Sequence, residues 1–232
     1  MINSSNLQNR ITDVFFNINQ AVQKAGKKFN DITIVAITKS HPNNIWNIAL
    51  DNKLTTLGES RVNEALEKNN QFQYRKKIEL HLIGHLQSNK VNKAIQIFDL
   101  IQTIDTIRLL KKINLQSEKI NKIQNIFLQI NTAKDPKKFG FDESQIYKAA
   151  EVATSLKHIN LTGIMTIPAI NININETKKI YTQTRKILEY IKVNINTNCQ
   201  NLSMGMSTDY VEAIEEGATH VRIGTALFGK RP

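Results

Sequence analysis

Short apolar runs alternate with longer polar stretches of helical spacing along most of the chain. The first run, Ile32–Thr38, is rich in β-branched residues, as is typical of a strand buried on both faces. Seven further strand-like segments follow: Leu54–Leu57, Leu80–Ile83, Leu100–Ile104, Ile126–Ile130, Leu161–Ile167, Leu202–Met206 and Val221–Ile223. Between them, the spacing predicts helices over Asn43–Asp51, Arg61–Asn69, Leu86–Ile97, Arg108–Ile120, Glu143–Leu156, Glu176–Ile191 and Asp209–Glu216.

This alternation predicts a single α/β domain over residues 1–232, built as a closed (β/α)8 barrel of the TIM type. An extra N-terminal helix over Leu7–Ala25 carries one apolar stripe, and we expect no helix after the last strand. An open doubly wound sheet is the main alternative. It would need a glycine-rich turn after the first strand, and Lys39-Ser40-His41-Pro42 supplies none.

The composition of the chain argues against several classes of function. The net charge of +11 suggests nucleic acid, but the 24 lysines are scattered and no aromatic residues interleave with them, so we expect no nucleic-acid partner. The single cysteine, Cys199, excludes an internal disulfide and a multi-cysteine metal site. No segment reaches the roughly 18 apolar residues of a membrane span. We therefore expect a cytoplasmic protein with no metal and no membrane association.

Lys39 closes the first apolar run and is the main candidate for chemistry. A lysine at the carboxyl end of a buried strand has its stem in apolar surroundings, and desolvation there lowers the pKa of the amine. A deprotonated amine is what a Schiff-base lysine needs. A surface lysine whose amine reaches water is the alternative for this residue taken alone.

The loops after the last two strands predict a phosphate site. In barrels of this type, phosphates usually bind after strands seven and eight. Ser207 is expected to cap the helix that begins near Asp209, where free N–H groups can receive a phosphate. Gly224 lets the backbone approach the anion, and Thr225 adds a hydroxyl donor.

Arg222 lies two residues before Gly224 and therefore shares its face of strand eight. Strand eight neighbours strand one in a closed barrel, so we expect Arg222 near Lys39. A lysine for an aldehyde, a phosphate cup and an arginine facing a ring nitrogen match pyridoxal 5'-phosphate (PLP). A salt bridge to a neighbouring carboxylate is the alternative role for Arg222.

These residues belong to longer stretches that together resemble the pyridoxal phosphate homeostasis protein family, single-domain relatives of the alanine racemase N-terminal barrel. The resemblance runs from about residue 32 to residue 229. Its motifs are Val35-Ala36-Ile37-Thr38-Lys39, Gly58-Glu59-Ser60-Arg61-Val62-Asn63-Glu64, His81-Leu82-Ile83-Gly84-His85-Leu86-Gln87-Ser88-Asn89-Lys90, Gln102-Thr103-Ile104-Asp105, Lys138-Phe139-Gly140, Gly163-Ile164-Met165-Thr166-Ile167-Pro168, Leu202-Ser203-Met204-Gly205-Met206-Ser207 and Val221-Arg222-Ile223-Gly224-Thr225.

The resemblance implies a role for each candidate. Lys39 would carry PLP as an internal aldimine, Arg222 would face the ring nitrogen and Met165 would lie near the ring. The phosphate would be held by Ser207, Gly224 and Thr225. Ser60 departs from the family, which commonly has asparagine after Gly-Glu, so a hydrogen bond to the cofactor is weaker or water-mediated here. We expect His81 and His85 to be structural or pocket-lining rather than catalytic.

We expect a binding protein rather than an enzyme. Racemases and decarboxylases with this barrel carry a second β domain, for which a chain ending at residue 232 leaves no room. An arginine at the ring nitrogen also makes PLP a poorer electron sink. The resemblance thus implies a monomeric carrier for intracellular vitamin B6 homeostasis, which buffers PLP or delivers it to apo PLP-dependent enzymes. The alternatives are a minimal PLP-dependent racemase or decarboxylase and a cofactor-free Schiff-base aldolase using Lys39.

Overall fold

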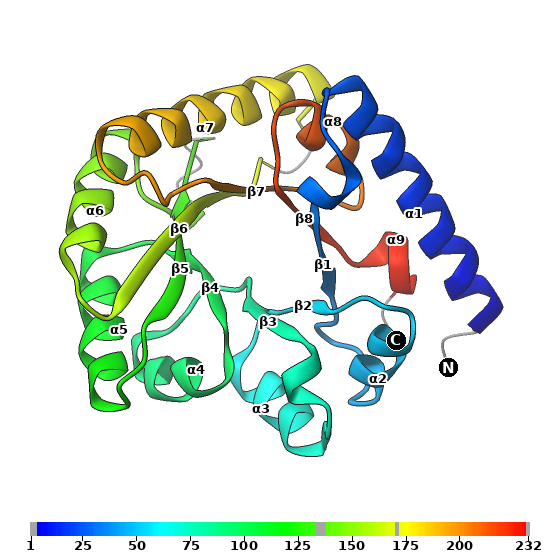
Figure 1. Ribbon diagram of the computed structural model, residues 1–232, viewed down its shortest axis with the longest axis horizontal. Coiled ribbons are helices and arrows are strands. Elements are labelled where there is room, and N and C mark those ends of the chain that lie inside the picture. The colour runs from blue at the N-terminus through cyan, green and yellow to red at the C-terminus, as the bar shows by residue number, and fades with distance from the viewer. Residues whose placement is uncertain (1–3, 133–137, 170–171, 231–232) are drawn as a thin grey trace.

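The computed structural model describes residues 4–132, 138–169 and 172–230. Eight parallel strands close into a barrel in chain order, with β8 paired to β1 (Figure 1). This confirms the predicted TIM-type fold. The strands are β1 Thr33–Ile37, β2 Thr56–Glu59, β3 Glu79–Leu82, β4 Leu100–Ile104, β5 Gln124–Ile130, β6 Ile159–Thr166, β7 Asn201–Met206 and β8 His220–Ile223.

The helices form a ring outside the strands (Figure 1). They are α1 Ser4–Lys24, α2 Ile45–Asp51, α3 Val62–Gln71, α4 Val91–Ile97, α5 Ile107–Lys119, α6 Glu143–Ser155, α7 Ile174–Asn194, α8 Tyr210–Glu215 and α9 Thr225–Phe228, with short 3-10 turns at Phe29–Asp31, Arg75–Lys77 and Ser88–Lys90. The predicted helix Leu86–Ile97 is shorter than expected because Gln87 is extended, so only a 3-10 turn precedes α4.

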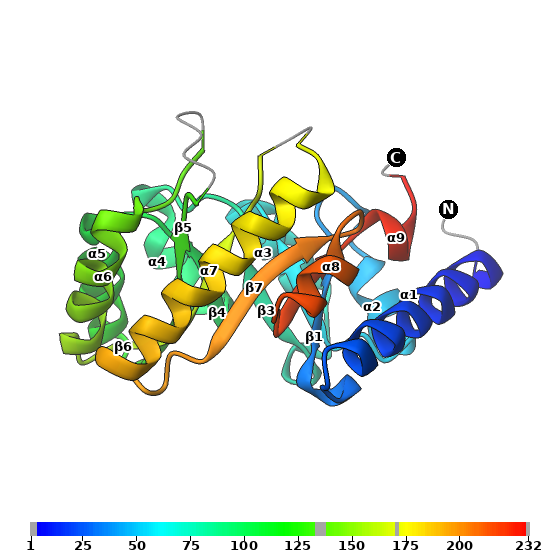
Figure 2. The same cartoon turned by 90° about the horizontal axis from the view of Figure 1, so that it is seen from above.

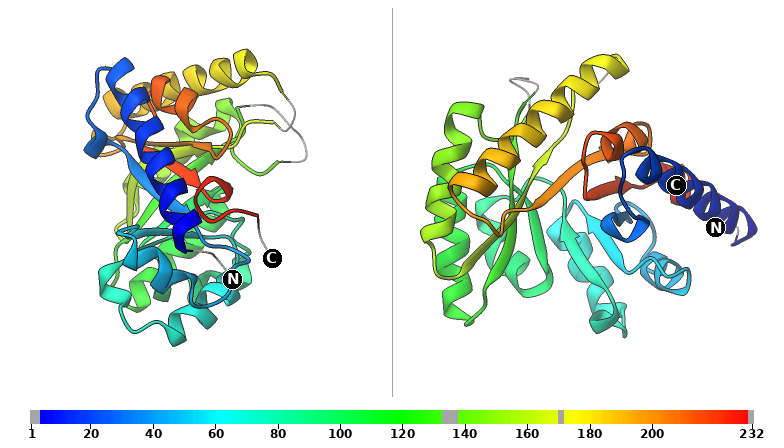
Figure 3. Two further views of the ribbon diagram at one scale, coloured as in Figure 1. Left: turned by 90° about the vertical axis from the view of Figure 1, so that its right-hand side faces the viewer. Right: turned by 45° about the horizontal axis from the view of Figure 1, so that its top comes forward.

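The N-terminal helix covers the last β/α unit, as its apolar stripe predicted. Leu7, Ile11, Val14, Ile18 and Val22 are all buried, and α1 lies along α8 and α9 (Figure 3). The expectation that no helix follows the last strand was wrong, because Thr225–Phe228 forms the single turn α9. Its apolar end packs beneath α1, since Leu227 and Phe228 are buried in the same core.

Side chains alternate between two sides of each strand, as the period of two requires. On β8, Val221 and Ile223 join the main core between barrel and helices, so Arg222 and His220 face the barrel interior. A small apolar cluster of Leu100, Phe127 and Met165 fills part of that interior, with Ile167 against it. The carboxyl ends of the strands, α9 and the start of α7 lie on one side of the molecule, the barrel mouth (Figure 2).

Candidate functional site

The pairing of β1 with β8 brings three of the expected site residues to one edge of the barrel mouth. Val35 is in register with Arg222 and Ala36 with Ile223, so Lys39 emerges beyond β1 next to the loop that follows β8. The contact is close, because a Cβ added at Gly224 would lie 3.3 Å from Cβ of Ile37. Lys39 itself is half-buried. Strand closure therefore places Lys39 beside the end of β8, the strand that carries Arg222 and leads into Gly224.

A buried ion network anchors the backbone on the amino side of Lys39. Lys68 on α3 has a fully buried side chain, and its Nζ donates to the Thr38 carbonyl at 2.8 Å. The same ammonium lies 2.8 Å from Oε1 of Glu59, which ends β2. Glu59 Oε1 also accepts from Thr38 Oγ1 at 2.7 Å and from Trp46 Nε1 at 3.1 Å. The hydroxyl and the carbonyl of Thr38 are thus both fixed by one network.

The carboxyl side of Lys39 is held by the same ammonium through a second carboxylate. Glu64 Oε1 lies 2.8 Å from Lys68 Nζ and accepts a 2.5 Å hydrogen bond from the Ser40 amide. Ser40 has φ +61°, a left-handed conformation uncommon for a residue with a side chain. The network of Lys68, Glu59 and Glu64 therefore turns the chain sharply after Lys39 and keeps it there.

The two carboxylates of this network differ in their electrostatics. Burial raises the pKa of Glu59 although Lys68, Thr38 and Trp46 all favour its charged form, and its Oε2 has no hydrogen-bond partner. Burial also raises the pKa of Glu64, but hydrogen bonds from Lys68 and the Ser40 amide outweigh it, and the net pKa is lowered. Glu64 therefore favours its charged form more strongly than Glu59 does.

Ser207 and the start of α9 form a donor cup at the mouth. The amides of Gly224 and Ala226 both donate to Ser207 Oγ, each at 3.2 Å. Thr225, between them, is exposed as the first residue of α9. The cup sits at the carboxyl ends of β7 and β8, where a phosphate was expected. The amide of Ala226 was not among the predicted residues.

The expectation that Ser207 caps the helix near Asp209 was wrong. α8 begins at Tyr210, and its N-cap Asp209 makes no side-chain cap. Instead, Asp209 Oδ1 accepts from the Met206 amide at 2.6 Å, and Oδ2 accepts from Tyr181 Oη at 2.9 Å. The carboxylate of Asp209 thus bonds an amide of its own turn. The Ser207 hydroxyl accepts instead from the amides at the start of α9.

The donor set of the cup fits a phosphate. Two backbone N–H groups already converge on one oxygen, which is the arrangement that phosphate oxygens require. A cationic guanidinium and a half-buried amine lie on the adjoining strands. Ser207, Gly224 and Thr225 would hold the phosphate of PLP, with the Ala226 amide added to the expected set.

Arg222 is buried, 4% exposed, and its side chain is fixed by two neutral acceptors. Nη1 donates to Ser203 Oγ at 2.7 Å, and Nη2 donates to the Thr166 carbonyl at 2.9 Å. Burial lowers the pKa of Arg222, opposed by the nearby Tyr181 and Asp209. In the described ranges no carboxylate lies within ion-pair distance of this guanidinium, which argues against the salt-bridge alternative.

Met165 lies in the barrel interior, one residue before the carbonyl that holds Arg222. It is fully buried, and it is in register with Ser203 on β7. Its thioether therefore forms part of the apolar floor below the mouth, together with Phe127 and Ile167.

A cavity of about 660 Å³ opens at the mouth beside the network. Ser60 and His85 contribute to its wall with Arg61, Val62, Asn63, Glu64, Glu67, Gln87 and Lys90. His85 Nδ1 lies 2.9 Å from Asp105 Oδ2, and the His85 ring stacks on Phe139 at 3.7 Å between centroids. Burial raises the pKa of Asp105 despite this partner. His85 is thus at the mouth, whereas His81 is fully buried inside the barrel.

Sequence reasoning missed the residues whose hydrogen bonds hold the backbone around Lys39 and the side chain of Arg222. Glu64 and Lys68 are four apart on a predicted helix, so their pairing was available from spacing alone. Gln102 and Ser203 meet only when the barrel closes, and no local spacing relates them. Cys199, assigned no role, is buried, and burial raises the pKa of its thiol to about 12.

The described residues contain no group of three or more His, Cys, Asp or Glu side chains arranged to hold a metal ion. No helix among them has the length and apolar character needed to cross a membrane.

The chain matches the family model of the alanine racemase N-terminal domain over residues 13–232. It is 34% identical to the "Pyridoxal phosphate homeostasis protein" of Vibrio alginolyticus over 235 residues, covering 98% of each chain. The protein of that name from Pasteurella multocida is 32% identical over 227 residues, with 97% of each chain covered.

Solved structures agree with these matches. PipY of Synechococcus elongatus, in a structure described as having PLP bound, superimposes with a TM-score of 0.81 at 29% identity, over 86% of this chain and 93% of that one. An alanine racemase from Clostridium difficile gives a TM-score of 0.74 at 18% identity, over 98% of this chain but only 57% of that one. The latter likeness concerns the barrel fold alone.

Proposed function

The chain belongs to the alanine racemase N-terminal domain family, within its branch of pyridoxal phosphate homeostasis proteins, and on that premise we propose that it binds PLP and keeps it available in the cell. In this proposal Lys39 binds the cofactor covalently, and the protein buffers PLP or passes it to apo PLP-dependent enzymes without turning over amino acids itself.

One observation carries the proposal. The Gly224 and Ala226 amides converge on Ser207 Oγ at the end of β8, and β8 pairs with the strand that ends beside Lys39. An anion cup and an amine on adjacent strands suit a ligand with a phosphate at one end and an aldehyde at the other. PLP is such a ligand, and PipY, a relative at about 30% identity, has been solved with PLP bound.

PLP, when bound, supplies an aldehyde for amines and an electron-withdrawing ring. Lys39 supplies the amine that joins this aldehyde, and the network of Lys68, Glu59 and Glu64 keeps the backbone around Lys39 in one position. Ser207, Gly224, Thr225 and Ala226 orient the phosphate. Met165 contributes apolar surface beneath the ring.

Arg222 supports a carrier over an enzyme. It donates hydrogen bonds to the neutral Ser203 hydroxyl and Thr166 carbonyl, and it would meet the ring nitrogen as a cationic N–H donor. A ring nitrogen that accepts from a guanidinium remains unprotonated, and it then withdraws electrons less strongly than a protonated one paired with a carboxylate. Carbanion chemistry on amino acids is disfavoured accordingly.

The experiment is to reduce the cofactor-loaded protein with borohydride and map the labelled peptide. We expect the label on Lys39. PLP bound to a lysine absorbs visible light, and we expect Lys39→Ala to lose this absorbance band while keeping the fold. Lys122 provides a control, because burial lowers the pKa of its amine, yet it lies before β5 at the opposite end of the barrel. Lys122→Ala should keep both band and label, and a label on any lysine other than Lys39 would overturn the assignment.

A further inference from the structure

A line of polar side chains crosses the barrel interior behind Arg222. Arg222 Nη1 lies 2.7 Å from Ser203 Oγ, which lies 2.7 Å from Gln102 Oε1. Gln102 Nε2 in turn lies 2.9 Å from His81 Nδ1. The four side chains come from β8, β7, β4 and β3, and none is more than 4% exposed. We call this set the interior relay: Arg222, Ser203, Gln102 and His81.

The hydrogen bonds of the interior relay run in one direction. A guanidinium has no acceptor, so Ser203 Oγ accepts from Arg222, and because Gln102 presents its oxygen, the serine gives its single hydrogen to Gln102 Oε1. The amide nitrogen of Gln102 therefore faces His81, and Nδ1 of His81 must accept. An imidazole that accepts at Nδ1 is neutral and carries its hydrogen at Nε2.

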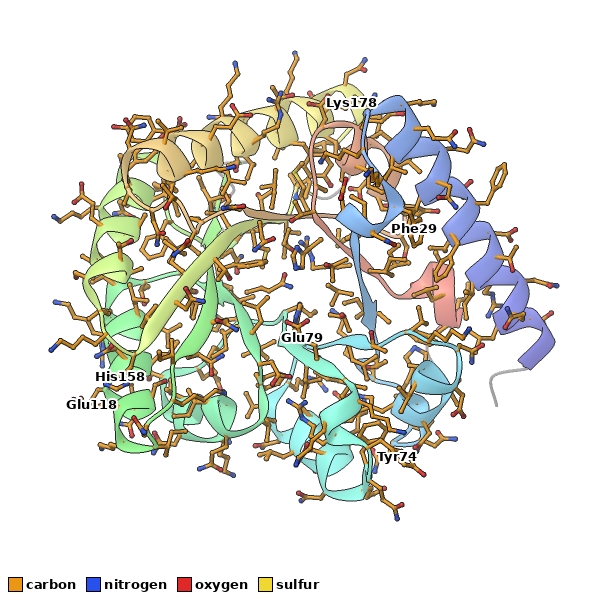
Figure 4. All side chains as sticks on the ribbon, in the orientation of Figure 1. Phe29, Tyr74, Glu79, Glu118, His158 and Lys178 are labelled. Atoms are coloured by element: carbon orange, nitrogen blue, oxygen red, sulfur yellow. The ribbon has the colours of Figure 1, made fainter. Side chains whose placement is uncertain are left out.

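The relay ends at the amino-terminal rim of the barrel. His81 Nε2 lies 3.0 Å from Glu79 Oε1, without the alignment of a regular hydrogen bond. Contact with His81 is the main cause that lowers the pKa of Glu79. Figure 4 shows Glu79 at the ring of strands, whereas Glu118 and His158 lie at the periphery. A buried cation near the mouth is thus linked by aligned dipoles to a carboxylate at the other end.

The neighbours of His81 other than Glu79 include a second histidine and apolar side chains. The ring of His220 lies 6.0 Å away between centroids, and burial lowers its pKa to about 3, so it is neutral. Phe127 packs edge-on against His220 and forms an apolar cluster with Leu100 and Met165. TIM barrels usually fill this space with branched apolar residues, and buried polar groups cost stability unless they are paired. The presence of four paired polar residues in this barrel interior therefore calls for an explanation.

We propose that Gln102 and His81 are positioning residues for the arginine at the ring nitrogen, acting through Ser203; this rests on the proposed function. While Gln102 presents its oxygen to Ser203, the serine hydrogen points away from Arg222 and the serine lone pairs face it. If Gln102 turned its amide nitrogen to Ser203, the serine oxygen would have to accept from both Gln102 and Arg222, and its hold on the guanidinium would weaken. By accepting at Nδ1, His81 thus keeps Gln102 in the orientation that holds Arg222 for the cofactor.

The first test uses the cofactor-free protein and asks for the His81 tautomer. With histidines labelled with ¹⁵N, the proposal expects Nδ1 without hydrogen and Nε2 with hydrogen, and His81→Asn identifies the signal among the five histidines of the chain. A hydrogen on Nδ1 would mean that Gln102 faces the other way, and it would overturn the relay. This result does not depend on whether PLP binds.

The second test compares two changes at Gln102. Gln102→Met removes the acceptor of the Ser203 hydrogen, and we expect PLP affinity to fall about three- to tenfold, the range of one neutral hydrogen bond, with a shifted visible band. Gln102→Glu keeps an acceptor for Ser203 but offers no donor to His81. It should bind PLP more tightly than Gln102→Met does, while His81 acquires a hydrogen on Nδ1.

Gln124→Met is the matched control, because Gln124 is also a buried amide, and it donates to the Phe98, Asp99 and Asn125 carbonyls at the amino end of β5. It should cost stability while leaving the affinity and the band unchanged. If Gln102→Met behaved like Gln124→Met, the relay would be structural only, and the proposal would fail. No binding by the unaltered chain would instead overturn the proposed function and with it the role toward PLP.

Discussion

Two lysines near the barrel mouth differ in what surrounds their amines. Lys39 is half-buried at the mouth, whereas the Lys68 side chain is fully buried between Glu59, Glu64 and the Thr38 carbonyl. A fully buried ammonium with three oxygen partners is held by them and has a structural role. Lys39 lies on the segment that this network fixes, half-buried at the mouth where the proposed ligand would bind.

At the residue scale we predict that Lys68→Met destabilises the fold by about 3–5 kcal/mol, because it leaves a buried carboxylate without its cation. It should also weaken PLP binding, since both Thr38 and Ser40 lose their anchor. Urea unfolding and cofactor titration measure the two effects. Lys122→Met is the control, because Lys122 also donates to two carbonyls, those of Ile95 and Phe98. It should lose stability without losing affinity, and equal affinity losses in both variants would refute the anchoring role.

At the element scale, Ser207 joins the loop after β7 to the start of α9. Ser207→Ala should therefore cost about 1 kcal/mol of stability, as loss of a helix cap does, and about tenfold in PLP affinity because the cup loses its hydroxyl. Thr106→Ala is matched to it: Thr106 caps α5 by accepting from the Leu109 amide at 3.2 Å, after a strand at the same mouth. Thermal unfolding should shift in both variants, but equilibrium dialysis should detect weaker binding only in Ser207→Ala.

The same loop shows what local sequence can and cannot predict. Strand β4 was predicted at its observed bounds, and the stripe on α1 was found, because periods of 2 and 3.6 residues are local signals. The partner of Ser207 was assigned wrongly, since Ser207 lies close in sequence to α8 and seventeen residues from Gly224. The strand order and the mouth were predictable from alternation, whereas the pairings across the barrel follow only from its closure and shear.

At the scale of the whole molecule, barrel closure produces two different ends. The mouth holds the donor cup, Lys39 and a cavity of about 660 Å³ whose wall includes exposed residues such as Arg61 and Gln87. The opposite end holds the rim carboxylate Glu79, which the interior relay links to the mouth. On the proposed function, a solvent-lined mouth would admit amines to PLP held by Lys39 and would let the cofactor leave. It does not suit a carbanion, which must be kept from water.

The last prediction separates carrier from enzyme. The PLP-loaded protein should restore activity to an apo PLP-dependent enzyme, while α-hydrogens of L-amino acids show no Lys39-dependent exchange with deuterium when followed by NMR. Lys39→Ala protein, incubated with PLP and desalted in parallel, should transfer nothing, which shows that delivery depends on cofactor held by Lys39. Stereochemically scrambled deuterium incorporation that disappears in Lys39→Ala would instead establish a minimal racemase. That outcome would outweigh the argument from Arg222, because turnover is a direct measurement of catalysis. An unprotonated ring nitrogen only disfavours such catalysis.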